Sequence, residues 1–170
     1  IGCRAMTETY RNIRPDDSDA LSVIAQDWSV VRQLGGWKWP YDPDQIRARS
    51  NPYDGDGFVW AICRDDRLIG TIGVTTGDLG YMLRSDVHGQ GIMTRAAVRA
   101  VDTAFDTTDR DHLTGSTWYD NAGSAHLLAK LGFEHWQSRY MQSRARKRPT
   151  MVHHRRLTRE TWQRLRTRAT

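Results

Sequence analysis

The chain has 170 residues, two cysteines, six histidines and a formal net charge of +5 at pH 7. This length suits one domain with a sizeable core, and two cysteines argue against a disulfide framework. No apolar run approaches the roughly eighteen residues of a membrane span, and the histidines lack the spacing of a metal site. We therefore expect a cytoplasmic protein that holds no metal.

The first segment, Ile1 to Met6, contains no apolar core of a signal peptide. We interpret residues 1–5 as an added leader before a native Met6, and we expect residues 6–170 to form a single domain. Cys63 ends the apolar run 58–63 and is expected to be a small buried hydrophobic residue rather than a nucleophile.

The N-terminal half of the chain alternates short strand and helix patterns. The sequence predicts a strand over 7–14, an amphipathic helix over 18–34 capped by Ser18 or Asp17, and a short helix over 43–50. After the turn at 54–57, the runs 58–64 and 68–75 predict a hairpin that turns at residues 65–67.

The C-terminal half continues the alternation. We expect strands over 79–83 and 112–118, helices over 92–105 and 121–131, and a closing pair of strands over 136–143 and 150–157. The first of these helices carries apolar residues at helical spacing, namely Met93, Ala97, Val101 and Ala104. The pattern predicts an α/β (α+β) fold, in which helices cover both faces of a mixed, mostly antiparallel sheet.

A turn rich in glycine joins the strand 79–83 to the helix that follows it. Gly89 and Gly91 carry no Cβ, so the backbone amides of this turn can approach a ligand closely. The amides point along a helix N-terminus, which favours phosphate. Thr94 stands where the dinucleotide fingerprint has its third glycine, and no P-loop lysine is present, so another kind of phosphate cradle is expected.

A second helix start lies about thirty residues further along. Asn121 occupies an N-cap position, three leucines form an apolar stripe over residues 127–131, and the pair Gly132 and Phe133 has the pattern of a left-handed C-cap. The two helix starts together suggest a site for a phosphorylated cofactor.

These residues resemble the GNAT superfamily of acetyl-coenzyme A dependent N-acetyltransferases, and within it the ribosomal-protein N-acetyltransferase branch. The family's phosphate signature falls on residues 88–93, where His88 replaces a Gln or Arg and Met93 replaces a small residue. The resemblance covers nearly the whole chain. It implies a sheet of six to seven strands whose fourth and fifth strands splay apart.

The resemblance also implies an activity, the transfer of acetyl from acetyl-coenzyme A directly to a primary amine through a ternary complex. The N–H of Leu83 is then expected to face the thioester carbonyl. The residues expected to bind the cofactor are Met82, Leu83, Gly89, Gln90, Gly91, Ile92, Met93, Thr94 and Asn121.

The proton-transfer residues are less clearly marked. Many family members have a Tyr seven residues after the Asn as proton donor, but this chain has Leu128 there, and Ser124 is the candidate general acid instead. Ser116 stands where several relatives place a Glu as base. Asp78, Asp120 and His126 remain open as bases.

The acceptor amine is left open between a protein N-terminus and a small molecule. Five tryptophans fall in segments that border the acceptor pocket in this family, and we expect about two of them to line it: Trp28, Trp37, Trp39, Trp118 and Trp136. The alternative to an enzyme is a GNAT-fold module that binds coenzyme A or a partner without turnover. The chain is expected to be a monomer or a homodimer.

The C-terminal end is strongly basic. From residue 144 onwards the chain has ten Lys and Arg residues against one acid, Glu160. This stripe could bind nucleic acid, attract an acidic substrate or form a solvated hairpin and end. We favour the solvated hairpin, because residues 144–149 have the pattern of an exposed turn between strands.

Overall fold

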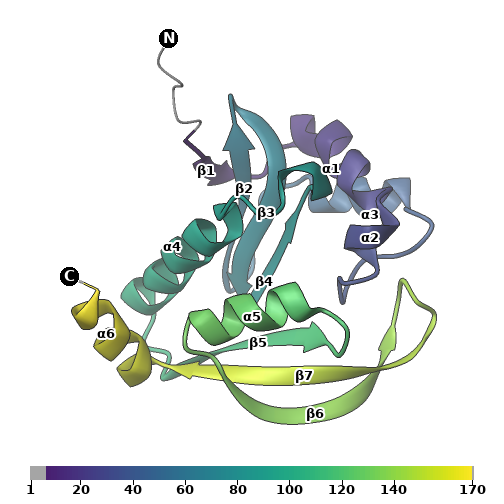
Figure 1. The fold of residues 1–170 in the computed structure, drawn as a ribbon. Helices are drawn as coiled ribbons and strands as arrows, with labels where there is room; N and C mark the ends of the chain where they lie inside the picture. Colours follow the sequence, from purple (N-terminus) through teal and green to yellow (C-terminus); the bar gives the residue numbers. More distant parts are fainter. Residues whose placement is uncertain (1–6, 170) are drawn as a thin grey trace.

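The computed structural model describes residues 7–169, so the expected leader and Met6 lie outside the described residues (Figure 1). Its strands form one mixed sheet in the order β1-β2-β3-β4-β5-β7-β6, and β4 and β5 are the parallel pair. The strands are β1 (Thr9–Asn12), β2 (Gly57–Arg64), β3 (Arg67–Thr75), β4 (Asp78–Leu83), β5 (His112–Trp118), β6 (Glu134–Ser143) and β7 (Arg148–Thr158). The predicted fold class is confirmed.

The helices are α1 (Ser18–Ala25), α2 (Trp28–Val31), α3 (Pro43–Arg49), α4 (Ile92–Thr107), α5 (Ala122–Lys130) and α6 (Arg159–Arg168), with 3-10 turns η1 (Pro15–Asp17) and η2 (Ser85–Val87). The single helix predicted over 18–34 was wrong. Asp27 has extended backbone and its carboxylate caps α2 by accepting from the Ser29 N–H, so the helix breaks between α1 and α2.

Two further details differ from the sequence prediction. Asp17 is the N-cap of α1, but its carboxylate accepts from Arg11 and from the Arg14 N–H rather than from the helix. Helix α6 was not predicted as an element, although the Thr158 hydroxyl caps it by accepting from the Thr161 N–H.

Helices cover the two faces of the sheet and create two cores. One core joins α4, α5 and α6 to residues such as Ile72, Leu113 and Leu157, and the other joins α1, α2 and α3 to Ala61 and Cys63. Buried Cys63 therefore behaves as the predicted small hydrophobic residue. Because α4 and α1 both contact β3, the centre of the sheet is covered on both sides.

The parallel strands β4 and β5 separate towards their C-terminal ends. They pair only at Asp78 with Thr114 and at Leu79 with Gly115, although both strands continue beyond these residues. The predicted splay is present, and it leaves a gap in the sheet between its two halves (Figure 1).

Several residues of the basic C-terminal stripe are engaged within the fold. Arg146 pairs with Asp120 and Arg166 with Asp102, while Arg159 donates to three backbone carbonyls. Within residues 7–169 no helix is long and apolar enough to cross a membrane, and no group of three or more metal-ligating side chains was found.

Candidate active site

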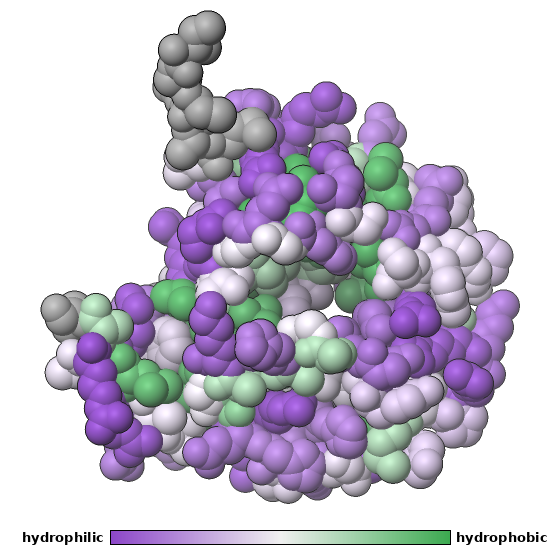
Figure 2. Space-filling view, viewed as in Figure 1, coloured by the Kyte–Doolittle hydropathy of each residue, from purple (hydrophilic) through white to green (hydrophobic). Residues whose placement is uncertain are grey.

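A cavity of about 730 Å³ lies at the gap between β4 and β5, and Figure 2 shows it as a hollow near the centre of that face. This volume falls within the range of roughly 300–1,000 Å³ that is typical of ligand pockets. One part of its wall comes from β4, the turn before α4 and the start of α5, and the other from α2, the loop after it and α3.

The glycine turn forms part of this wall. Gly89 and Gly91 have φ values of +74° and +71°, a left-handed conformation that favours glycine. A Cβ on Gly89 would enter open space, and Gly91 is the N-cap of α4 with no side-chain cap. The first amides of α4 are therefore left without a capping side chain, as at an anion-binding helix start.

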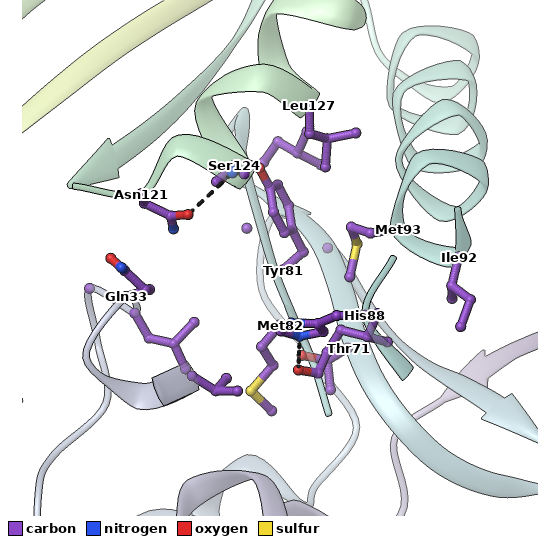
Figure 3. A pocket seen from close by; sticks show the side chains of 18 of the residues that line it. Gln33, Thr71, Tyr81, Met82, His88, Ile92, Met93, Asn121, Ser124 and Leu127 are labelled. Carbon is purple, nitrogen blue, oxygen red and sulfur yellow. Dashed lines mark hydrogen bonds between the residues drawn. The ribbon is translucent and has the colours of Figure 1, made fainter. Parts of the chain in front are cut away.

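The start of α5 lies across the cavity from this turn. Its N-cap Asn121 accepts a hydrogen bond from the Ser124 N–H at 3.2 Å, as predicted (Figure 3). The C-cap prediction is also confirmed, because Gly132 has a φ of +92° and the Phe133 N–H donates to the Leu128 carbonyl.

The backbone of Leu83 faces the gap between the strands. The N–H of the next residue, Arg84, donates to Ile69 of β3, and hydrogen-bonding directions alternate along a strand. The N–H and carbonyl of Leu83 therefore point away from β3. His88 holds the carbonyl through a 2.9 Å hydrogen bond from its Nε2, which also fixes the turn (Figure 3).

A tyrosine that the sequence analysis missed reaches the same place. Tyr81 of β4 points towards α5, and its hydroxyl forms a short hydrogen bond with the Ser124 hydroxyl (Figure 3). Burial raises the pKa of Tyr81, and this outweighs the opposing effects of the Ser124 hydrogen bond and of Arg155. The phenol therefore keeps its proton well above neutral pH.

Asp78 is the carboxylate among the residues that line the cavity. Its side chain meets the solvent of the cavity, but the surrounding protein raises its pKa, partly opposed by a 2.7 Å hydrogen bond from the Thr114 hydroxyl. The Asp78 and Tyr81 side chains point to opposite faces of β4, since side chains alternate along a strand.

The other candidate bases lie in different surroundings. Asp120 accepts both hydrogen bonds of a bidentate pair with Arg146, which lowers its pKa, and it does not line the cavity. His126 lines the cavity from α5, and Ser116 lines it from β5.

The second part of the wall contains one of the five tryptophans. Trp37 lines the cavity, and the guanidinium of Arg49 lies 4.7 Å from its ring centroid. Trp28 and Trp39 instead pack against each other in a tilted arrangement, and Trp118 and Trp136 are not among the lining residues. The expectation of about two tryptophans was therefore too high.

The predicted cofactor residues gather at this cavity with one exception. Eight of the nine line it, as does Ser124, whereas the Gln90 side chain lies outside and accepts a hydrogen bond from Arg64 at 2.8 Å.

Comparison with known proteins agrees with this geometry. A family profile described as "Acetyltransferase (GNAT) domain" matches residues 9–134, which is most of the chain. The chain belongs to the GNAT acetyltransferase family. A relative from Bacillus subtilis (strain 168), named "Probable N-acetyltransferase YjcK", is 36% identical over 77 residues. That match covers 41% of this chain. It also covers 42% of the relative, so the chain matches less than half of the length of this curated relative.

Solved structures share the GNAT fold over nearly the whole chain. The spermidine N-acetyltransferase from Vibrio cholerae, solved with CoA and spermine, has a TM-score of 0.78 at 14% identity and covers 92% of this chain and 98% of its own. The ribosomal-protein-S5-alanine acetyltransferase from Vibrio fischeri has a TM-score of 0.68 at 20% identity, and the match covers 91% of this chain and 94% of the other. At these identities the likeness concerns the fold.

Proposed function

We propose that this protein transfers acetyl from acetyl-coenzyme A directly to a primary amine. The observation that carries the proposal is the convergence of a glycine turn, a splayed strand and a raised-pKa carboxylate on one cavity. The proposed acceptor is either a protein N-terminus or a small amine.

The donor part of the cavity fits coenzyme A. The open amides at the start of α4 and the space above Gly89 suit a pyrophosphate, and Lys130 of α5 adds a positive charge to the lining. The backbone of Leu83 faces the gap, where a pantetheine chain would complete the interrupted sheet edge, and Met82 lines the cavity beside it. Bound acetyl-coenzyme A supplies an activated thioester.

In this proposal the Leu83 N–H orients and polarises the thioester carbonyl. An amide held in place by β3 pairing on both sides needs no reorganisation as charge develops on that oxygen. The amine nitrogen forms a bond to the carbonyl carbon, and the bond from that carbon to sulfur breaks.

Asp78 is the proposed general base, and it acts through water, because it lies five residues before Leu83 on β4, about 16 Å along an extended strand. A neutral amine is needed for attack, and a carboxylate with a raised pKa accepts a proton more readily than an ordinary Asp. Its side chain lies on the face of β4 opposite to Tyr81. The amine therefore loses its proton on the Asp78 side of the sheet, and the sulfur receives a different proton from the Tyr81 side.

Ser124 and Tyr81 are the proposed proton donors for the departing thiolate. The Ser124 hydroxyl gives its proton to sulfur and recovers one from the Tyr81 hydroxyl, with which it is hydrogen bonded. The raised pKa of Tyr81 keeps its hydroxyl protonated at neutral pH, and after donating to Ser124 it recovers a proton from the solvent of the cavity. This pair takes the role that the resemblance assigns to a single tyrosine at the position of Leu128.

The test is release of free thiol from acetyl-coenzyme A in the presence of a panel of peptides and small amines. We expect amine-dependent thiol release, together with a rise in unfolding temperature when coenzyme A alone is added. Binding of coenzyme A without thiol release for any amine would instead support a module that binds the cofactor without turnover.

A further inference from the structure

An unpaired arginine on the acceptor part of the cavity has no place in the chemistry described above. Arg49, the last residue of α3, lines the cavity and lies face-on to Trp37. Its Nη2 donates to the Gly36 carbonyl at 3.1 Å. Among residues 7–169 no carboxylate lies within ion-pair distance of it, whereas its neighbour on the helix, Arg47, pairs with Asp44.

The surroundings of Arg49 add positive charge rather than cancel it. The pKa of Arg49 is lowered, first by the protein around it and second by repulsion from Arg144 in the turn between β6 and β7. Arg146 anchors that turn, since it is bound to Asp120, to the Arg32 carbonyl and to the Gln33 side chain. The second arginine is therefore held near Arg49 by the fold.

We propose that Arg49 forms an anion subsite, and that the preferred acceptor is a primary amine carrying a carboxylate on the same molecule. This inference rests on the proposed function and deepens it. The acceptor's amine lies at the thioester, on the part of the cavity that Asp78 also lines, and its carboxylate lies at Arg49, which offers a planar, stacked guanidinium with unused donors.

The charges on this part of the wall disfavour a polycation. A polyamine would need several carboxylates to hold its extra ammonium groups, but Asp78 is the one carboxylate among the described residues that line the cavity. An additional ammonium group would also approach Arg49. The subsite thus separates this chain from the spermidine acetyltransferase whose fold it shares.

The experiment uses acceptors that differ only in their distal group. Straight-chain ω-amino carboxylates of two to six carbons are each paired with the matching carboxamide and diamine, and kcat/KM is measured for all. We expect the carboxylate to exceed its carboxamide by about ten- to hundred-fold at the best chain length, with the diamine poorest. Equal rates within the pairs, or a preference for diamines, would overturn the subsite.

Two variants assign the preference to Arg49. Arg49→Gln should abolish the preference, so that within this variant kcat/KM for the carboxylate falls to the level of the carboxamide. The matched control is Arg47→Gln, an exposed arginine of the same helix that does not line the cavity. A preference that survives Arg49→Gln, or an equal loss for both acceptors, means that Arg49 has only a structural role.

A binding measurement separates this inference from the proposed function. The best carboxylate and its carboxamide are titrated by calorimetry into the complex with coenzyme A, where no turnover occurs. Selective binding of the carboxylate with no turnover of any amine keeps the subsite and contradicts the transferase. Turnover without selective binding keeps the transferase and contradicts the subsite.

Discussion

The two parts of the cavity wall are built in different ways. The proposed donor part consists of backbone: a left-handed glycine turn, two helix starts and one strand edge that faces a gap. The proposed acceptor part consists of side chains from α2, α3 and the loop between them, such as Trp37 and Arg49. A backbone site restricts which donor binds, while a side-chain site can change its acceptor by substitution, which suits a family with many acceptors.

The largest effect is expected at Asp78, the proposed general base. Asp78→Asn removes the proposed base, so kcat should fall by about 10²- to 10⁴-fold while the affinity for coenzyme A is unchanged. Thiol release and a coenzyme A titration measure the two quantities. A variant with full turnover would remove Asp78 from the mechanism, and Asp86→Asn, outside the cavity lining, serves as the control.

The same variant should be more stable than the wild type at neutral pH. The folded-state pKa of Asp78 is raised, so its ionised form opposes folding above that pKa, and this cost disappears as the pH falls through it. Thermal unfolding should therefore show a higher midpoint for Asp78→Asn at pH 7, with a difference that shrinks in acid.

The glycine turn tests the donor part alone. A Cβ at Gly89 would occupy the space proposed for the pyrophosphate, so Gly89→Ala should weaken coenzyme A binding by about ten-fold or more, from lost amide contacts and backbone strain. Gly77→Ala is the control for strain, because Gly77 also has positive φ, at +84°, but lies outside this cavity. Equal losses in both variants would indicate strain rather than a phosphate site.

Ser124 and Tyr81 should act as one unit. We expect Ser124→Ala and Tyr81→Phe each to lower kcat by about ten-fold or more, and the double variant to lose little more than either single one. The coupling is read from single-turnover rates with acetyl-coenzyme A at saturation. Independent, additive losses would mean that the two hydroxyls do not share a proton path.

The smallest effect is a shift in pH dependence. The Thr114 hydroxyl donates to Asp78 and favours its ionised form, so Thr114→Val should raise the pKa of Asp78 further. Because the base works when ionised, the acid limb of the kcat/KM profile should move to higher pH. An unmoved limb would show that another group controls it.

Local signals in the sequence predicted the backbone conformation of the proposed donor part well. Gly89, Gly91 and Asn121 act through backbone conformation and capping, which depend on neighbours along the chain, and their positions were predicted correctly. The break before α2 also had a local signal, since Asp27 is followed by Ser29 in a capping arrangement. The amphipathic pattern of the longer segment concealed it.

Contacts between distant segments could not be predicted in this way. Tyr81 and Ser124 are 43 residues apart, and only the divergence of β4 and β5 brings their hydroxyls together. The alternation of β4 did place Leu79, Tyr81 and Leu83 on one face, which is the signal that could have identified the tyrosine. Arg49 has no local pattern at all, because its environment comes from Trp37 and the distant turn at Arg144.

The central claim is that this cavity transfers acetyl to an amine rather than only binding coenzyme A. The most direct measurement quantifies acetylated amine by mass spectrometry and free thiol in the same sample, for the wild type and Asp78→Asn. We predict equal amounts of the two products, both nearly abolished in the variant. Saturable coenzyme A binding with no acetylated amine from any acceptor would contradict the account.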